Sequence, residues 1–153
     1  MSKKQDRLLK DYKNAVHGVI FTQVSVGEHS HGRVHSEHRF IDGVRLVHSR
    51  DSTGKLKKFA ENWREFGKQV EGKTVEAIEV DECLNRWVIG QAIVGKVMLE
   101  IKYKVSAAIP VVVCKERDTS LEQACTRLGV AVWTPRHRFL VRVDSSSKGT
   151  ESS

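Results

Sequence analysis

Cysteine is scarce in this 153-residue chain, and long apolar runs are absent. Cys83, Cys114 and Cys125 are odd in number and form no Cys-x-x-Cys pair, which disfavours a disulfide framework or a cysteine-based zinc site. No apolar run approaches the roughly 20 residues of a membrane helix. The polar N-terminus lacks the apolar core of a signal peptide. We therefore expect a cytoplasmic protein with no membrane partner.

Three loop motifs of common enzyme classes are also missing. The sequence contains no glycine-rich phosphate-binding loop, no Rossmann glycine pattern and no Gly-x-Ser-x-Gly elbow. Because each of these chemistries depends on its own loop, the absences disfavour nucleotide hydrolysis, dinucleotide redox chemistry and serine hydrolysis.

The charge balance is basic. Lys and Arg number 26 against 19 Asp and Glu, which gives a formal net charge of +7 at pH 7. This excess favours a polyanionic partner such as nucleic acid, although a basic surface also occurs without one. The length suits one domain with its own core, which we place at residues 1–143. The Ser-rich residues 144–153 are expected to be disordered.

Hydrophobic periodicity predicts an α/β fold, with a mixed central sheet flanked by helices. Helices are predicted at residues 2–16, 55–70, 86–104 and 120–128. Strands are predicted at 19–26, 39–47, 74–81, 109–114 and 129–133, with a possible edge strand at 134–143. The run at 109–114 shows no alternation and reads as a strand buried on both faces. Strand, helix, strand order makes at least part of the sheet parallel.

The helix at 86–104 carries a broad apolar face that we expect to pack in the core. This face comprises Trp87, Val88, Ala92, Ile93, Val97, Met98 and Ile101.

Two acids lie close together near the end of the strand at 74–81. Alternation places Glu79 and Asp81 on one face, two residues apart. Neighbouring carboxylates raise each other's pKa unless a cation lies between them, so this pair suggests a divalent metal such as Mg²⁺. The alternative is a solvated strand end.

A third acid, Asp42, lies on the strand at 39–47. Alternation places Asp42 with Val44 on one face, and Ile41 with Gly43 and Arg45 on the other. A buried Asp is costly unless it binds a cation or hydrogen-bond donors. Alternatively, Asp42 and Gly43 form a turn, for which Asp-Gly is a favoured pair.

Histidines gather at residues 27–38, as His29, His31, His35 and His38. They could converge on zinc or nickel. A polar loop is the alternative, favoured because no cysteine contributes and the spacing matches no zinc motif.

Taken together, these elements resemble the PD-(D/E)xK (restriction-endonuclease-like) nuclease superfamily. The similarity covers residues 3–133. It rests on the Glu79–Asp81 pair, on Ile89-Gly90-Gln91 in the next helix, on the buried strand with Val111-Val112-Val113, and on Gly-Val-Ala-Val-Trp at 129–133.

The resemblance implies a metal-dependent endonuclease that hydrolyses DNA phosphodiester bonds with water activated by Mg²⁺, for which Mn²⁺ could substitute. Asp42 and Glu79 match the family's metal-binding acids, and Gln91 matches its helix glutamine, which would position the water or a phosphate. Asp81 occupies the position of the usual lysine and would be a third catalytic and metal-binding acid. The missing lysine leaves an alternative, a non-catalytic nucleic-acid-binding protein that retains the nuclease fold.

Basic side chains are expected to hold the DNA backbone. The candidates are Lys55, Lys57, Lys58, Arg64, Lys68, Arg136, His137 and Arg138. A homodimer would let two sites cut two strands.

Overall fold

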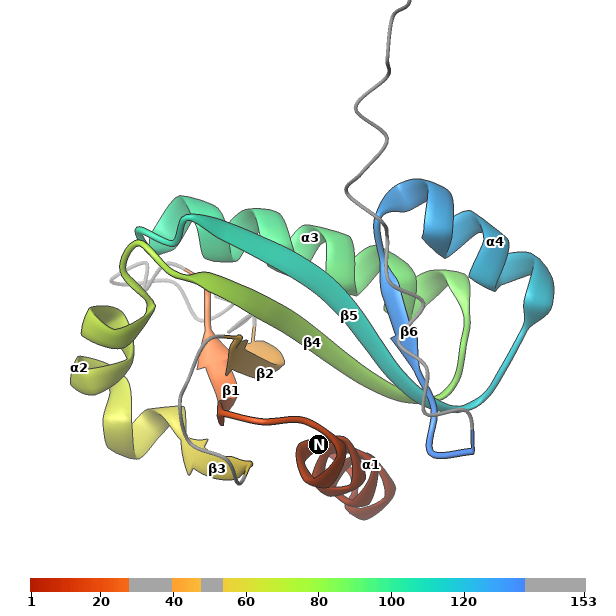
Figure 1. Ribbon diagram of the computed structural model, residues 1–153, viewed down its shortest axis with the longest axis horizontal. Coiled ribbons are helices and arrows are strands. Elements are labelled where there is room, and N and C mark those ends of the chain that lie inside the picture. The colour runs from red at the N-terminus through yellow and green to blue at the C-terminus, as the bar shows by residue number, and fades with distance from the viewer. Residues whose placement is uncertain (28–39, 48–53, 137–153) are drawn as a thin grey trace, which may run out of the picture.

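The computed structural model describes residues 1–27, 40–47 and 54–136. Its strands are β1 (Val19–Ser25), β2 (Phe40–Leu46), β3 (Lys55–Lys58), β4 (Thr74–Cys83), β5 (Ala107–Glu116) and β6 (Ala131–Trp133). Its helices are α1 (Lys3–Ala15), α2 (Phe59–Val70), α3 (Arg86–Lys102) and α4 (Thr119–Leu128). The strands form one six-stranded sheet in the order β3-β1-β2-β4-β5-β6, with helices on both faces (Figure 1). The predicted α/β class with a mixed, helix-flanked sheet is confirmed.

One strand of the sheet, β2, runs opposite to all the others. β4, β5 and β6 are parallel neighbours, whereas β2 is antiparallel to both β1 and β4. The predicted parallel section is therefore confirmed. In β5, Val111 packs on the side of α1 and Val112 packs on the side of α3 and α4. Burial on both faces is therefore confirmed for residues 110–114, whereas Ile109 is exposed.

The start of α1 is fixed to β4. Ser2 caps the helix by accepting the backbone N–H of Gln5 at 3.2 Å, and the Gln5 side chain accepts the N–H of Ser2 at 2.9 Å. The amide of Gln5 also donates to the Val80 carbonyl at 3.0 Å. Leu9 and Tyr12 are buried against the sheet. This anchoring sets the helix N-terminus beside the carboxyl end of β4.

The segment at 55–70 differs from its prediction in its first four residues. Lys55–Lys58 is strand β3, which pairs in parallel with β1, and the helix begins at Phe59. The prediction of a helix from residue 55 is wrong because the open edge of β1 offers backbone partners that a helical pattern does not reveal. Lysines on such an edge strand also discourage pairing with another chain.

Helix α3 is apolar on more sides than the sheet can cover. Val88, Ala92 and Leu99 are buried, whereas Trp87 and Ile101 are 74% and 80% exposed. The prediction that Trp87, Val97 and Ile101 belong to the core face is wrong, since only the side of α3 that packs on β4 and β5 is buried.

Several predictions fall wholly or partly outside the described residues. These are the histidine cluster from His29 to His38, most of the edge strand at 134–143, and the tail at 144–153. Within the described ranges, none of the helices has both the length and the apolar character needed to cross a bilayer.

Candidate active site

Asp42 lies where the pairing of β2 with β1 is interrupted and the pairing of β2 with β4 ends. β2 pairs regularly with β4 from Gly43, opposite Ile78, onward, so Glu79 is the next residue opposite Asp42. At this position a side chain replaces the backbone as the hydrogen-bond partner of β4: Asp42 Oδ2 accepts the backbone N–H of Val80 at 2.9 Å. The carboxyl group of Asp42 is therefore held against β4.

On its other side, Asp42 lies opposite Gln23 of β1. Gln23 has φ of 53°, a left-handed conformation that is uncommon for a residue other than glycine. Its amide Nε2 donates to Asp42 Oδ1 at 3.4 Å. A strained backbone residue that supports an acidic side chain is a frequent feature of functional sites.

The interruption also changes which side chains share a face. Ile41 packs in the same core cluster as Val44, on the side of α2 and α3. Gly43 faces the opposite side, since a Cβ there would meet Leu9 of α1. The prediction that Ile41 shares a face with Gly43 and Arg45 is wrong. It assumed a regular strand, whereas the backbone is irregular where Gln23 and Asp42 face each other.

Asp42 and Glu79 form a pair of electrostatically coupled carboxyl groups. Glu79 is only 6% exposed. Burial, the Asp42 charge and the hydrogen bond to Asp42 together raise the pKa of Glu79 to about 9. Burial also raises the pKa of Asp42, but the Val80 N–H, Glu79 and Gln23 oppose this change by hydrogen bonding to the Asp42 carboxylate. At neutral pH, the Glu79 carboxyl group therefore keeps its proton.

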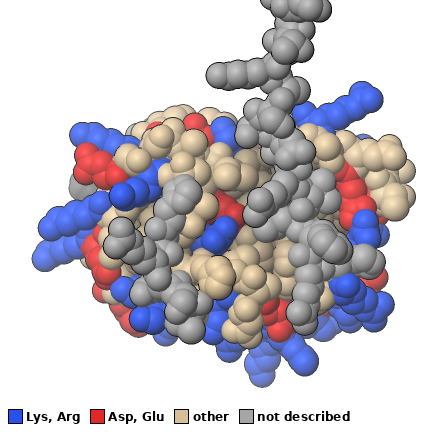
Figure 2. Space-filling model, viewed as in Figure 1, with Lys and Arg blue, Asp and Glu red and all other residues tan. Residues whose placement is uncertain are grey.

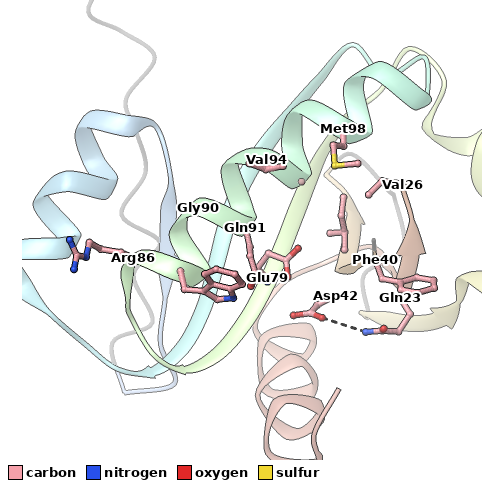
Figure 3. Close-up of a pocket in the computed structure, with 13 residues that line it drawn as sticks. Gln23, Val26, Phe40, Asp42, Glu79, Arg86, Gly90, Gln91, Val94 and Met98 are labelled. Carbon is pink, nitrogen blue, oxygen red and sulfur yellow. Dashed lines mark hydrogen bonds between the residues drawn. The ribbon is translucent and has the colours of Figure 1, made fainter. Parts of the chain in front are cut away.

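The carboxyl pair lines a pocket of about 750 Å³ between β1, β2 and α3. Gln91 lines the same pocket, and Figure 3 shows it projecting from α3 toward Glu79. Apolar side chains such as Val26, Val94 and Met98 complete the walls. The structure thus brings together three of the four predicted catalytic residues.

Asp81 takes a different role from the one predicted. Its Oδ2 accepts the side-chain amide of Asn85 at 3.1 Å, and its Oδ1 accepts the backbone N–H of Glu82 at 2.7 Å. Asn85 in turn caps α3 by accepting the N–H of Val88 at 2.9 Å. Asp81 is not among the residues that line the pocket. Across the described ranges, no group of three or more His, Cys, Asp or Glu is placed to hold a metal. The expected trio of acids is therefore reduced to a pair.

The predicted DNA-contacting residues lie in two separate places. Lys55, Lys57 and Lys58 are on β3, where Lys58 pairs with Thr22, next to Gln23 of the pocket. Arg64 and Lys68 are exposed on α2. Lys57 is engaged with Glu65 at 2.9 Å.

Arg136 is on the other face of the sheet. It lines a groove of about 450 Å³ together with Lys4, Arg7 and Lys115. His137 and Arg138 lie outside the described residues. Figure 2 shows Lys and Arg side chains around the periphery of this view, with acidic side chains among them.

Gln23, Arg86 and Trp87 are among the pocket residues that were not predicted from the sequence. Gln23 gives no signal, since a left-handed strand residue cannot be read from its neighbours. Arg86 and Trp87 form the first turn of α3, directly after the acidic strand, and that position is the one clue available. Arg86 is the one cationic side chain among the described residues that line the pocket, and it extends away from the acid pair (Figure 3).

A buried ion pair joins the same two strands on the opposite face. Arg45 Nε and Nη2 donate to Glu76 Oε1 and Oε2 at 2.6 and 2.9 Å. Tyr12 donates its hydroxyl to Glu76 at 2.6 Å, and Arg45 also donates to the His17 carbonyl at 2.9 Å. Arg45 and Glu76 are each three residues from Asp42 and Glu79, so the network fixes β2 against β4 beside the acid pair.

The arrangement has a definite chemical capacity. Two carboxyl groups that share one proton can exchange that proton for a divalent cation, or can act as an acid and a base. The amide of Gln91 can donate to an anionic oxygen in the same pocket. No family model, curated protein or solved structure matches the chain.

Proposed function

We propose that the protein is a metal-dependent nuclease of restriction-endonuclease-like fold that hydrolyses DNA phosphodiester bonds. The observation that carries the proposal is the meeting of Asp42 and Glu79, from neighbouring strands, at the floor of a pocket that Gln91 also lines. These two acids and this glutamine occupy the positions that the family resemblance implies for its metal-binding acids and its helix glutamine. The order of helices and strands along the chain supports the same assignment.

The carboxyl pair suits Mg²⁺. This ion prefers hard oxygen donors, commonly one or two carboxylates completed by water, and the pocket has room for water. Asp42 and Glu79 would hold it, and Mn²⁺ has similar donor preferences. When bound, the ion would supply positive charge to the scissile phosphate and activate water for attack.

The chain's own side chains prepare this site. The Val80 N–H and the Gln23 amide fix the orientation of Asp42. Glu79 stays protonated until a cation compensates its charge, because it is buried beside Asp42. Gln91 can donate to a phosphate oxygen or accept from water, and so would position the reacting groups.

A second candidate function is a non-catalytic nucleic-acid-binding protein with the same fold. Asp81 replaces the family lysine and is engaged with Asn85, while Arg86 extends away from the acids. In the part of the pocket that the structure describes, no cationic side chain therefore lies beside the acid pair. The basic residues of β3 and of the groove at Arg136 could hold nucleic acid without cleaving it.

Cleavage of supercoiled plasmid in Mg²⁺ or Mn²⁺ tests the proposal. The wild-type protein is expected to nick or linearise the plasmid, and Glu79→Gln to lose at least about a hundredfold in rate. Glu116→Gln is the matched control, because Glu116 is an exposed acid at the end of the neighbouring strand. Salt-sensitive binding with no cleavage by any of these proteins would instead establish the second candidate. Light scattering of the free protein and its DNA complex tests the homodimer that we propose for cutting both strands.

A further inference from the structure

An exposed aromatic ring borders the candidate active site. Trp87, the second residue of α3, lines the pocket while 74% exposed. Phe40 of β2, also a pocket residue, is 47% exposed. A large aromatic surface in water is costly, and indole faces are favoured surfaces for stacking nucleic-acid bases. The position of Trp87 therefore points to a flat, apolar ligand group at the mouth of the pocket.

The acid pair is recessed relative to that ring. Glu79 is 6% exposed, whereas Trp87 is 74% exposed, and both line one pocket. The phosphates of an undistorted duplex follow a stiff helix and would have to leave it to reach such a floor. An unpaired nucleotide costs less to move, because no base pair has to be broken. A pocket of about 750 Å³ is also within the range that encloses a small organic ligand.

The positive charge of Arg86 at the mouth of the pocket is suited to the phosphate of a nucleotide. Arg86 precedes Trp87 and extends away from the acids, where it can pair with a phosphate that flanks a stacked base (Figure 3).

We infer that the pocket receives an unpaired nucleotide whose base stacks on Trp87, so that the substrate is single-stranded DNA or DNA with unpaired residues at the cleavage point. This inference names the substrate class of the site proposed above and rests on that proposal.

Fluorescence anisotropy of a labelled oligonucleotide of about 15 residues, in excess EDTA to prevent cleavage, tests the inference. The full-length protein is compared on a single strand and on the matching duplex. Wild-type protein is expected to bind the single strand about tenfold more tightly than the duplex. Trp87→Leu is expected to lose about tenfold in single-strand affinity, and Trp87→Phe to keep most of it, because a phenyl ring still stacks.

Ile101→Ala is the control for these variants. Ile101 lies on the same helix, is 80% exposed and is not a pocket residue, so its replacement should leave both affinities unchanged. An RNA version of the single strand identifies the sugar that the site accepts. Loss of binding to the DNA single strand in Trp87→Leu, with Ile101→Ala unaffected, supports the inference, whereas binding of the RNA strand alone would overturn it.

Equal affinity for duplex and single strand, or equal binding by Trp87→Leu and wild type, would overturn the inference. Glu79-dependent plasmid cleavage combined with that result would leave the nuclease proposal standing alone. Trp87-dependent binding without cleavage in either metal would remove the nuclease proposal and retain an unpaired-base site in a binding protein.

Discussion

Asp42 of β2 and Glu79 of β4 bring their carboxyl groups into one pocket from neighbouring strands, and the charge of Asp42 helps burial to raise the pKa of Glu79. The pair is supported from outside by the Val80 N–H, by Gln23 and by the Arg45–Glu76 ion pair on the far face. Strand pairing alone would allow two acids to splay apart. These supports instead hold them together at the floor of a pocket, where a proton or a metal must compensate their charge.

Metal binding is expected to release a proton. Because Glu79 has a raised pKa of about 9, a cation that needs both carboxylates must displace its proton. Affinity for Mn²⁺ should therefore rise about tenfold per pH unit up to about pH 9 and then level off. Calorimetry in buffers of different ionisation enthalpy measures the released proton. An affinity that does not change between about pH 6 and about pH 9 would contradict this.

Stability without metal is expected to fall as pH rises. Unfolded Glu79 ionises near its ordinary pKa of 4.5, whereas native Glu79 keeps its proton up to about pH 9. The native state therefore binds more protons between these values, and the free energy of unfolding decreases with pH across that window and is steady above it. Glu79→Gln should raise the free energy of unfolding by roughly 2–4 kcal/mol at about pH 8, and by little near pH 4. Urea titrations at the two pH values measure this, and equal gains at both would refute the account.

Breaking the buried ion pair is expected to destabilise the protein strongly. Arg45→Met leaves the Glu76 carboxylate buried with only Tyr12 as its remaining side-chain donor among the contacts described above. A loss of about 3–5 kcal/mol is typical for such a change. Arg45→Met combined with Glu76→Gln should recover part of the loss. Urea denaturation measures the free energy of unfolding, and Lys58→Met, at an exposed lysine, is the control. A loss below about 1 kcal/mol in Arg45→Met would contradict the prediction, because ordinary surface ion pairs contribute no more than that.

Asp81 is expected to matter for stability and little for cleavage. Its carboxylate holds Asn85, which caps α3, so Asp81→Ala should cost about 1 kcal/mol of stability. Cleavage by the folded variant should stay within about threefold of wild type, whereas Asp42→Asn should lose about a hundredfold or more. Plasmid cleavage rates and thermal unfolding are compared for the two variants. Equal loss of cleavage in both would return Asp81 to the catalytic group.

Sequence patterns predicted the regular parts of this fold. The apolar, unalternating strand β5 and the periodic helices α1 and α4 have strong local signals, and the structure contains them. β3 was missed because its four residues become a strand only through pairing with β1. The exposed side of α3 was missed because periodicity shows that a face is apolar and does not show what covers it.

The candidate site was only partly predictable for related reasons. Asp42, Glu79 and Gln91 stood out through their types and order, and they line one pocket. Asp81 was misplaced because strand alternation does not anticipate that its carboxylate binds Asn85 in the adjoining loop. The pairing of Arg45 with Glu76 and the left-handed Gln23 depend on contacts between strands far apart in the sequence.

Electron paramagnetic resonance of Mn²⁺ at about pH 8.5 tests most directly whether Asp42 and Glu79 form a metal site. The account predicts that free Mn²⁺ signal is lost on adding wild-type protein and on adding Glu116→Gln, and that Asp42→Asn and Glu79→Gln leave the signal nearly unchanged. Equal Mn²⁺ binding by all four proteins, or none by the wild type, would contradict it.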